Sequence, residues 1–290
     1  MNEAATVKVK KSSAFGEFIY RLTKSASAKI GLIILGLVIL FCIIGPLFVP
    51  YGVNEMDMTL MFAKPSAAHP FGCDSLGRDI MIRLMYGGRY SLILGLSASV
   101  LSGFIGIIIG CFAGYVGGVV ETIIMRFMDV WSALPAMLLC ILLSAVFGAG
   151  FIPTIVALII GQIPGGVRMT RGQVLAERNK EYIEAAESIN CPKAVLMFKH
   201  LLPNVIQPMI IIMTMSVGSN ITMAASLSYI GLGIQPPEPE WGAMLAAGRA
   251  YIRQVPHLIT FPGIMIALTV LAVNLLGDGL RDALDPKMRD

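Results

Sequence analysis

Long runs without a charged residue alternate with short polar stretches along this chain. The uncharged runs are largely apolar and cover residues 30–49, 92–120, 130–167, 201–237 and 254–277. About 20 residues of helix, at 1.5 Å each, cross the roughly 30 Å hydrocarbon core of a bilayer. The Gly-Ala-Gly stretch at 148–150, followed by Pro153, divides the third run into two. The pattern therefore predicts six membrane-spanning helices, with both chain ends on the same side.

The longest polar interruption, residues 173–204, has a helical pattern of its own. Winding residues 175–190 at 100° per residue gives one apolar stripe and an acidic opposite side. The stripe consists of Leu175, Tyr182, Ala186 and Ile189, and the acidic side of Glu177, Glu181, Glu184 and Glu187. Helices that lie on lipid headgroups favour Lys and Arg on the polar face, so the acidic face favours a protein partner over the membrane surface.

The second half of this interruption predicts a turn and another short helix. Asn190 tolerates the positive φ that a tight turn needs, and Pro192 suits the start of a helix. That helix carries Val195, Phe198 and Leu202 at core spacing, and Pro203 is expected to end it. The segment is thus predicted to form a helix, a tight turn and a short helix.

Composition and charge place the protein in a membrane. Hydrophobic residues make up 56% of the 290 and charged ones 14%, with a mean hydropathy of +0.77. The Lys and Arg residues gather before the first span, in the 172–204 loop and at the C-terminus. By the positive-inside rule these segments, including the 1–29 tail, are cytoplasmic. The net charge of +4 then needs no nucleic-acid partner, and lipid is the expected surrounding.

Two charges fall near the third predicted span. Arg126 and Asp129 are three residues apart, on one helical face, and are expected to neutralise each other where charge is costly. A proton relay is the alternative interpretation of the pair. Gly106, Gly110 and Gly114 form a small-residue stripe in the second span, which predicts close helix packing.

Candidates for a metal site and for an aromatic cluster lie on or beside the predicted outer loops, residues 50–89 and 235–256. His69, Cys73 and Asp74 lack a fourth metal ligand, so a loop with glycine turns is favoured over a metal site. Trp241, Tyr229 and Tyr251 suggest an interfacial aromatic belt, with substrate stacking as the alternative. The five scattered cysteines form no disulfide or zinc pattern. There is no G-x-x-x-x-G-K-[ST] motif, so any ATP and magnesium chemistry is expected on another polypeptide, with no cofactor held here.

The 172–204 segment resembles the EAA loop of ABC importer permeases. The likeness rests on Glu184-Ala185-Ala186, on position 190, and on Leu202-Pro203-Asn204. The family has Gly where this chain has Asn190. In that family the loop is cytoplasmic and docks on a separate ATP-hydrolysing subunit, so the resemblance implies a coupling role for Glu181, Glu184, Ala185, Ala186, Asn190, Leu202 and Pro203.

Further segments resemble the second permease subunit of oligopeptide, dipeptide and nickel transporters. Residues 69–79 (HPFGCDSLGRD) are similar to that family's H-x-x-G-T-D-x-x-G-R-D, with Cys73 in place of Thr, and Trp241 stands in a P-x-P-x-W-G motif. The sequence 227–233 and the ending from 274 to 286 also match. The outer-loop candidates implied by these motifs are Asp74, Gly77, Arg78, Asp79 and Trp241.

The resemblance implies an all-α, polytopic protein with the six-helix permease domain of a type I ABC importer over residues 30–290. It implies a homologous second permease, two ATP-binding subunits and an extracytoplasmic solute-binding protein as partners. Peptides are the expected cargo, with nickel, a metal chelate or glutathione as alternatives. A secondary transporter, in which Asp129 couples to an ion, is the first alternative class, and a non-transporting assembly factor or receptor is the second.

Overall fold

The computed structural model describes residue 20 and residues 22–284, and the regular elements of that part of the chain are all helical. The longer helices are α2 (Ala26–Ile43), α3 (Ile80–Val116), α4 (Gly118–Trp131), α5 (Ala136–Phe147), α6 (Phe151–Arg178), α9 (Leu202–Tyr229) and α11 (His257–Leu284). The shorter ones are η1 (Gly45–Phe48), η2 (Met58–Leu60), α7 (Glu181–Ser188), α8 (Lys193–Val195), the π-helix η3 (Leu196–Leu201), α10 (Trp241–Gly248) and η4 (Arg249–Tyr251). Most of the predicted basic tail, residues 1–19 and 21, and the last residues, 285–290, lie outside the described residues.

Five helical segments are long and apolar enough to cross a membrane. A sixth span is obtained if α4 and α5, which are bent by 76° at a short break, are counted together. Pro135 stands at that break, directly before α5, where it cannot donate a helical hydrogen bond. With this pair counted as one span the helices match the six predicted spans, and without it they give five.

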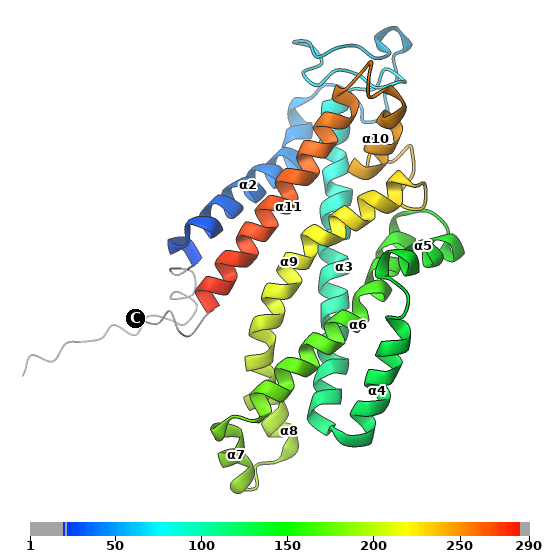
Figure 1. The fold of residues 1–290 in the computed structure, drawn as a ribbon. Coiled ribbons are helices and arrows are strands. Elements are labelled where there is room, and N and C mark those ends of the chain that lie inside the picture. Colours follow the sequence, from blue (N-terminus) through cyan, green and yellow to red (C-terminus); the bar gives the residue numbers. More distant parts are fainter. Residues whose placement is uncertain (1–19, 21, 285–290) are drawn as a thin grey trace, which may run out of the picture.

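The helices form one elongated bundle with different structures at its two ends (Figure 1). Helices α2 and α11 lie side by side, α3 runs through the middle, and α6 and α9 cross it obliquely. The segment before α3 and the short helix α10 occupy one end, whereas α7 and α8 occupy the other. The two predicted loop regions thus lie at opposite ends of the bundle.

The predicted glycine stripe is confirmed as a packing surface. A Cβ on Gly106 would approach the backbone of Gly166 in α6 to 2.9 Å, and one on Gly110 would lie 2.6 Å from the Thr170 side chain. These distances are shorter than van der Waals contact, so only glycine permits the observed approach of α3 to α6.

Several predicted boundaries are wrong, most of all that of the second span. Helix α3 begins at Ile80, where Asp79 caps it by accepting from the Ile82 N–H, rather than at 92. The outer loop predicted at 50–89 therefore ends at 79. The added turns of α3 contain Arg83 and Arg89, and both side chains donate to backbone carbonyls: Arg83 to Val53, and Arg89 to Cys42 and Ile43 at the end of α2. The helix can consequently carry them.

The other boundaries shift for local reasons. The first span covers 26–43 rather than 30–49, because the chain tightens into a 3-10 turn containing Pro46. The last helix continues to Leu284 instead of ending at 277. The outer segment 235–256 contains α10, which was not predicted, and Glu240 caps it by accepting from the Ala243 N–H.

Candidate functional site

Residues 175–190, predicted to form one helix, are divided between the end of α6 and the separate helix α7. Helix α6 ends at Arg178 and α7 begins at Glu181, with Asn179 and Lys180 between them. Glu181 and Glu184 lie in the first turn of α7, where carboxylates interact favourably with the helix dipole. The break redirects α7 relative to α6 and changes which side chains are buried.

The buried face of the loop is offset from the predicted one. Ile183 is fully buried, together with Leu196 and Leu201. The side chains expected to be covered are instead exposed: Tyr182 is 39% exposed, Ile189 80% and Phe198 64%. The offset follows from the break at 179–180 and from η3, whose wider π-turns change the helical register. The loop thus presents apolar side chains beside the exposed Glu181, Glu184 and Ala185, while Ala186 is half-buried.

The predicted turn at Asn190 is confirmed. Asn190 has φ +54°, the left-handed region that favours Gly and tolerates Asn. The turn is closed by hydrogen bonds from the Asn190 N–H to the Glu187 carbonyl (2.9 Å) and from the Cys191 N–H to the Ala186 carbonyl (3.1 Å). Asn therefore satisfies the backbone requirement that Gly meets in the family loop.

Contrary to the prediction, Pro203 does not end the helix. Leu202 begins α9 and Pro203 sits in its first turn, directly after the π-turns of η3, where the helical hydrogen-bonding pattern changes. The chain from Lys193 onward is helical without interruption into α9. The second half of the loop is therefore a direct extension of a membrane-spanning helix.

A small polar network joins the two halves of the loop. Tyr182 donates to a carboxylate oxygen of Glu177, and the Asn204 side-chain amide donates to the Tyr182 hydroxyl oxygen over 2.9 Å. Lys180 pairs with Glu177 at 2.7 Å. Burial and the hydrogen bond to Glu177 raise the pKa of Tyr182 to about 12, so the phenol stays protonated and continues to donate. The network connects the end of α6 with α7 and the start of α9.

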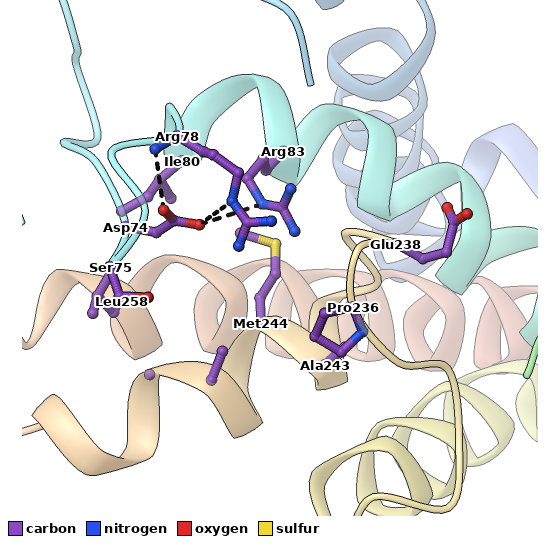
Figure 2. Close-up of a pocket in the computed structure, with 12 residues that line it drawn as sticks. Asp74, Ser75, Arg78, Ile80, Arg83, Pro236, Glu238, Ala243, Met244 and Leu258 are labelled. Atoms are coloured by element: carbon purple, nitrogen blue, oxygen red, sulfur yellow. Dashed lines mark hydrogen bonds and ion pairs between the residues drawn. The ribbon is translucent and has the colours of Figure 1, made fainter. Parts of the chain in front are cut away.

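At the opposite end of the bundle, the predicted outer-loop residues Asp74 and Arg78 lie together with Arg83 (Figure 2). Asp74 accepts from the Arg78 guanidinium at 2.7 Å and lies 3.7 Å from that of Arg83. Asp79 pairs with His69 at 2.8 Å. Gly77 has φ +70°, and a Cβ there would collide with the Asp57 backbone. The cluster fixes the loop on the end of α3.

Arg83 was not among the predicted site residues, although it connects three segments. Its guanidinium donates to the Val53 carbonyl (3.1 Å), the Asn54 side chain (2.9 Å) and the Pro237 carbonyl (3.2 Å). Only the clustering of Arg78 and Arg83 after the loop could have indicated this role in the sequence. Arg83 thus joins the loop before α3 to the loop before α10.

Trp241 does not belong to an interfacial belt. Its side chain is fully buried, and its indole N–H donates to the Leu84 carbonyl at 2.9 Å. Tyr229 remains 42% exposed beneath the Arg249 guanidinium, and Tyr251 packs against Phe62. Trp241 is consequently a packing residue between α3 and α10.

The predicted ion pair within the membrane has a different partner. Asp129 pairs with the Arg168 guanidinium of α6, at 3.0 Å, and not with Arg126 as expected. Residues three positions apart on one helix share a face, as Arg126 and Asp129 do, but Arg168 reaches the Asp129 carboxylate from the neighbouring helix. A second pair, Glu121 with Arg171, joins the same two helices, with Nε to Oε1 at 2.6 Å.

Two of the three metal-ligand candidates in the outer loop, His69 and Asp74, have structural partners. No group of three or more His, Cys, Asp or Glu side chains in the described part of the chain is arranged to hold a metal ion. His69 pairs with Asp79, and Asp74 pairs with Arg78 and Arg83.

Comparison with known proteins agrees with these features. Residues 106–290 match the family described as the binding-protein-dependent transport system inner membrane component, and residues 13–65 match the N-terminal transmembrane domain of oligopeptide transport permease C. The fold is similar to a chain of the MetNI methionine ABC transporter, with a TM-score of 0.56 and 20% identity over 71% of this chain and 98% of that one.

Full-length relatives are more similar in sequence. The di/tripeptide transport system permease protein DppC of Pseudomonas aeruginosa is 40% identical, over 96% of this chain and 94% of its own. The probable D,D-dipeptide permease DdpC of Escherichia coli is 38% identical over 98% and 96%, and the glutathione permease GsiD of Pectobacterium atrosepticum is 44% identical over 83% and 80%. With its broken third span, its loop between α6 and α9 and these matches, the chain belongs to the binding-protein-dependent inner membrane permeases of ABC importers, in the peptide transport branch.

Proposed function

We propose that this chain is one of two permease subunits of an ATP-driven importer of short peptides. The observation that carries the cargo assignment is the 40% identity with a di/tripeptide permease over 96% of the chain. Its partners would be a homologous permease, two ATP-binding subunits on the cytoplasmic side and a solute-binding protein on the outside. Both termini and α7 would be cytoplasmic, and the Asp74 cluster would face outward.

Coupling to ATP hydrolysis would run through α7. Its exposed Glu181, Glu184 and Ala185 would contact the ATP-binding subunit, with Tyr182 and Ile189 supplying apolar area. Because η3 continues directly into α9, a displacement of the loop would reach the membrane span without being lost in a flexible linker. The α4–α5 break and Pro164 within α6 offer points where the spans could bend.

The outer cluster would receive the solute-binding protein. Arg83 and Asp74 hold the 50–79 segment against the loop that precedes α10. The same segments contact α3 and α11. Binding of the solute-binding protein to this rigid surface would therefore act on both helices. Gly77, Arg78 and Asp79 would maintain the surface, and Trp241 would anchor α10 beneath it.

Reconstitution tests this function. The chain is expressed with its partner subunits in proteoliposomes, and uptake of a radiolabelled dipeptide is measured with ATP and the binding protein present. Uptake that requires ATP and is lost in Ala186→Glu, which places a charge in the α7 docking face, is the expected result. Uptake that persists with an ion gradient alone would instead identify a secondary transporter.

Glutathione is the second candidate cargo, since the glutathione permease GsiD is 44% identical over 83% of this chain. The same proteoliposomes distinguish the two. If unlabelled dipeptides inhibit the uptake of labelled dipeptide and glutathione does not, the peptide assignment is supported. If glutathione is the stronger inhibitor, the glutathione assignment is supported.

A further inference from the structure

A small pocket lies beside Asp74 at the end of the bundle that carries α10 (Figure 2). Its volume is about 30 Å³, and the buried side chains of Arg78 and Arg83 form part of its wall. Other lining residues are exposed and mark the mouth of the pocket: Pro236, Glu238 and Ala247. The pocket therefore connects the surface with two buried arginines.

These two arginines share a single carboxylate. Asp74 accepts from Arg78 Nε at 2.7 Å and lies 3.7 Å from Arg83 Nε. Within the described part of the chain, no other carboxylate lies within ion-pair distance of either guanidinium. Glu238 lines the pocket, but Figure 2 shows its carboxylate turned away from both arginines. Two positive charges beside one negative charge leave the pocket wall with an excess of positive charge.

Arg78 also has hydrogen-bond donors without a partner. The amino groups of Arg83 donate to Val53, Asn54 and Pro237. The Arg78 side chain is only 8% exposed, and its one side-chain hydrogen bond to a described residue runs from Nε to Asp74. Its terminal amino groups are not among the buried atoms that lack both a partner and access to solvent, so they open onto the pocket. A buried guanidinium of this kind favours an acceptor with two oxygens, such as a carboxylate.

The size of the pocket limits what can enter it. A cavity needs about 10–15 Å³ to hold a single water molecule. A pocket of about 30 Å³ therefore holds only a few atoms. The carboxylate at the tip of an Asp or Glu side chain fits this space, whereas a whole dipeptide is too large for it.

We propose that this pocket receives the carboxylate of an Asp or Glu side chain of the solute-binding protein, and that the terminal amino groups of Arg78 donate to it. The inference rests on the proposed binding-protein-dependent import and identifies the contact by which the binding protein is held. Met244 of α10 and Leu258 of α11 line the same pocket, and Arg78 directly precedes α3. The inserted carboxylate would therefore lie where three helical elements meet, and docking would act on all of them.

The first test measures the association and dissociation rates of the peptide-loaded binding protein on the assembled complex in lipid nanodiscs. Arg78→Gln is compared with Arg253→Gln, because Arg253 is an exposed cation before α11 that does not line the pocket. Loss of one partner of a buried charge pair acts mainly on dissociation, whereas loss of a rim charge acts mainly on association. Dissociation should be about tenfold faster or more in Arg78→Gln and should change by less than about twofold in Arg253→Gln. Equal dissociation rates for the wild type and Arg78→Gln, or equal changes in the two variants, would overturn the inference.

A second pair of variants leaves Arg78 and Asp74 in place, since their ion pair also holds the loop. Ala247 is exposed on α10 and lines the pocket. Ala247→Glu supplies a competing carboxylate at the mouth, and Ala247→Gln is the neutral control of the same size. Binding of the solute-binding protein should be about tenfold weaker in Ala247→Glu, because like charges then meet at the contact, and should stay within about twofold of the wild type in Ala247→Gln. Similar affinities for the two variants would contradict the pocket assignment.

The same assay shows which molecule supplies the carboxylate. With the binding protein loaded with a C-terminally amidated peptide, Arg78→Gln should cause the same loss of binding as with the free peptide. A loss that appears only with a free C-terminus would assign Arg78 to the cargo and overturn the docking contact. If the wild-type complex takes up no peptide, or takes it up without a binding protein, the proposed function itself is wrong. If the wild type imports peptide with its binding protein and Arg78→Gln binds that protein equally well, only the pocket assignment fails.

Discussion

The Asn204 side-chain amide donates a hydrogen bond of 2.9 Å to the Tyr182 hydroxyl oxygen and so ties the first turn of α9 to α7. Tyr182 in turn donates to Glu177 near the end of α6. Three helical elements that are separate in the sequence meet at one phenol. A movement of α7 must therefore act on both membrane helices that flank the loop.

Removing this hydroxyl should weaken coupling without unfolding the loop. Tyr182→Phe keeps the ring and loses both hydrogen bonds, each with a net contribution of about 1 kcal/mol. We expect fewer peptides taken up per ATP hydrolysed, measured as the ratio of the two rates in proteoliposomes. A ratio equal to that of the wild type would show that the network does not transmit the movement.

Ile183 and Ile189 should separate folding from docking. Ile183 is fully buried, so Ile183→Ala should destabilise the permease by about 2–4 kcal/mol and lower its melting temperature. Ile189 is 80% exposed, so Ile189→Ala should leave the melting temperature of the isolated permease unchanged while weakening capture of the ATP-binding subunit. Thermal unfolding in detergent and copurification measure the two effects, and the opposite assignment would refute the docking face.

Gly110 should tolerate no side chain. A Cβ there would lie 2.6 Å from both the Thr170 Cβ and the Val167 carbonyl oxygen, so Gly110→Ala must separate α3 from α6 and should lower the melting temperature. Gly36→Ala is the matched control, because α2 has open space at that position. Equal melting temperatures for the two variants would disprove the tight α3–α6 contact.

Cys73 should be inert to thiol reagents at neutral pH. Burial, with Asp79 and Asp74 nearby, raises the pKa of its thiol to about 11. At pH 8 only about one thiol in a thousand is then the reactive thiolate. Because the folded pKa is raised, the neutral thiol is favoured, and its contribution to stability is lost as pH rises from about 9 through about 11. Alkylation of Cys73, followed by mass spectrometry, should become appreciable only toward that range; rapid labelling at pH 7 would contradict the burial.

The sequence predicted most of the architecture because hydrophobic length is a strong signal. Five of the predicted spans are single helices and the α4–α5 pair corresponds to the sixth, the glycine stripe packs as expected, and Asn190 adopts the predicted turn. The start of α3 was missed because Arg83 and Arg89 look unfavourable in a span until their distant carbonyl partners are known. Such partners lie far away in the chain and leave no local pattern.

The finer errors at the candidate sites have the same origin. A two-residue break after Arg178 and the π-turns of η3 changed the buried face of the loop, and neither has a distinctive residue pattern. The partner of Asp129 was assigned to Arg126 because helical spacing describes neighbours on one helix only. Tertiary contacts between α4 and α6 decided the pairing, and single-helix periodicity contains no information about them.

The most direct measurement of the central claim is the sidedness of Cys191, which lies in the loop between α7 and α8. It is half-exposed, whereas Cys42, Cys73, Cys111 and Cys140 are buried. A membrane-impermeant maleimide, with Cys191→Ser as the background control, should label Cys191 in inverted membrane vesicles and leave it unlabelled in intact spheroplasts. Labelling from the outside of spheroplasts would place the loop on the wrong side of the membrane for an ATP-hydrolysing partner and would contradict the account.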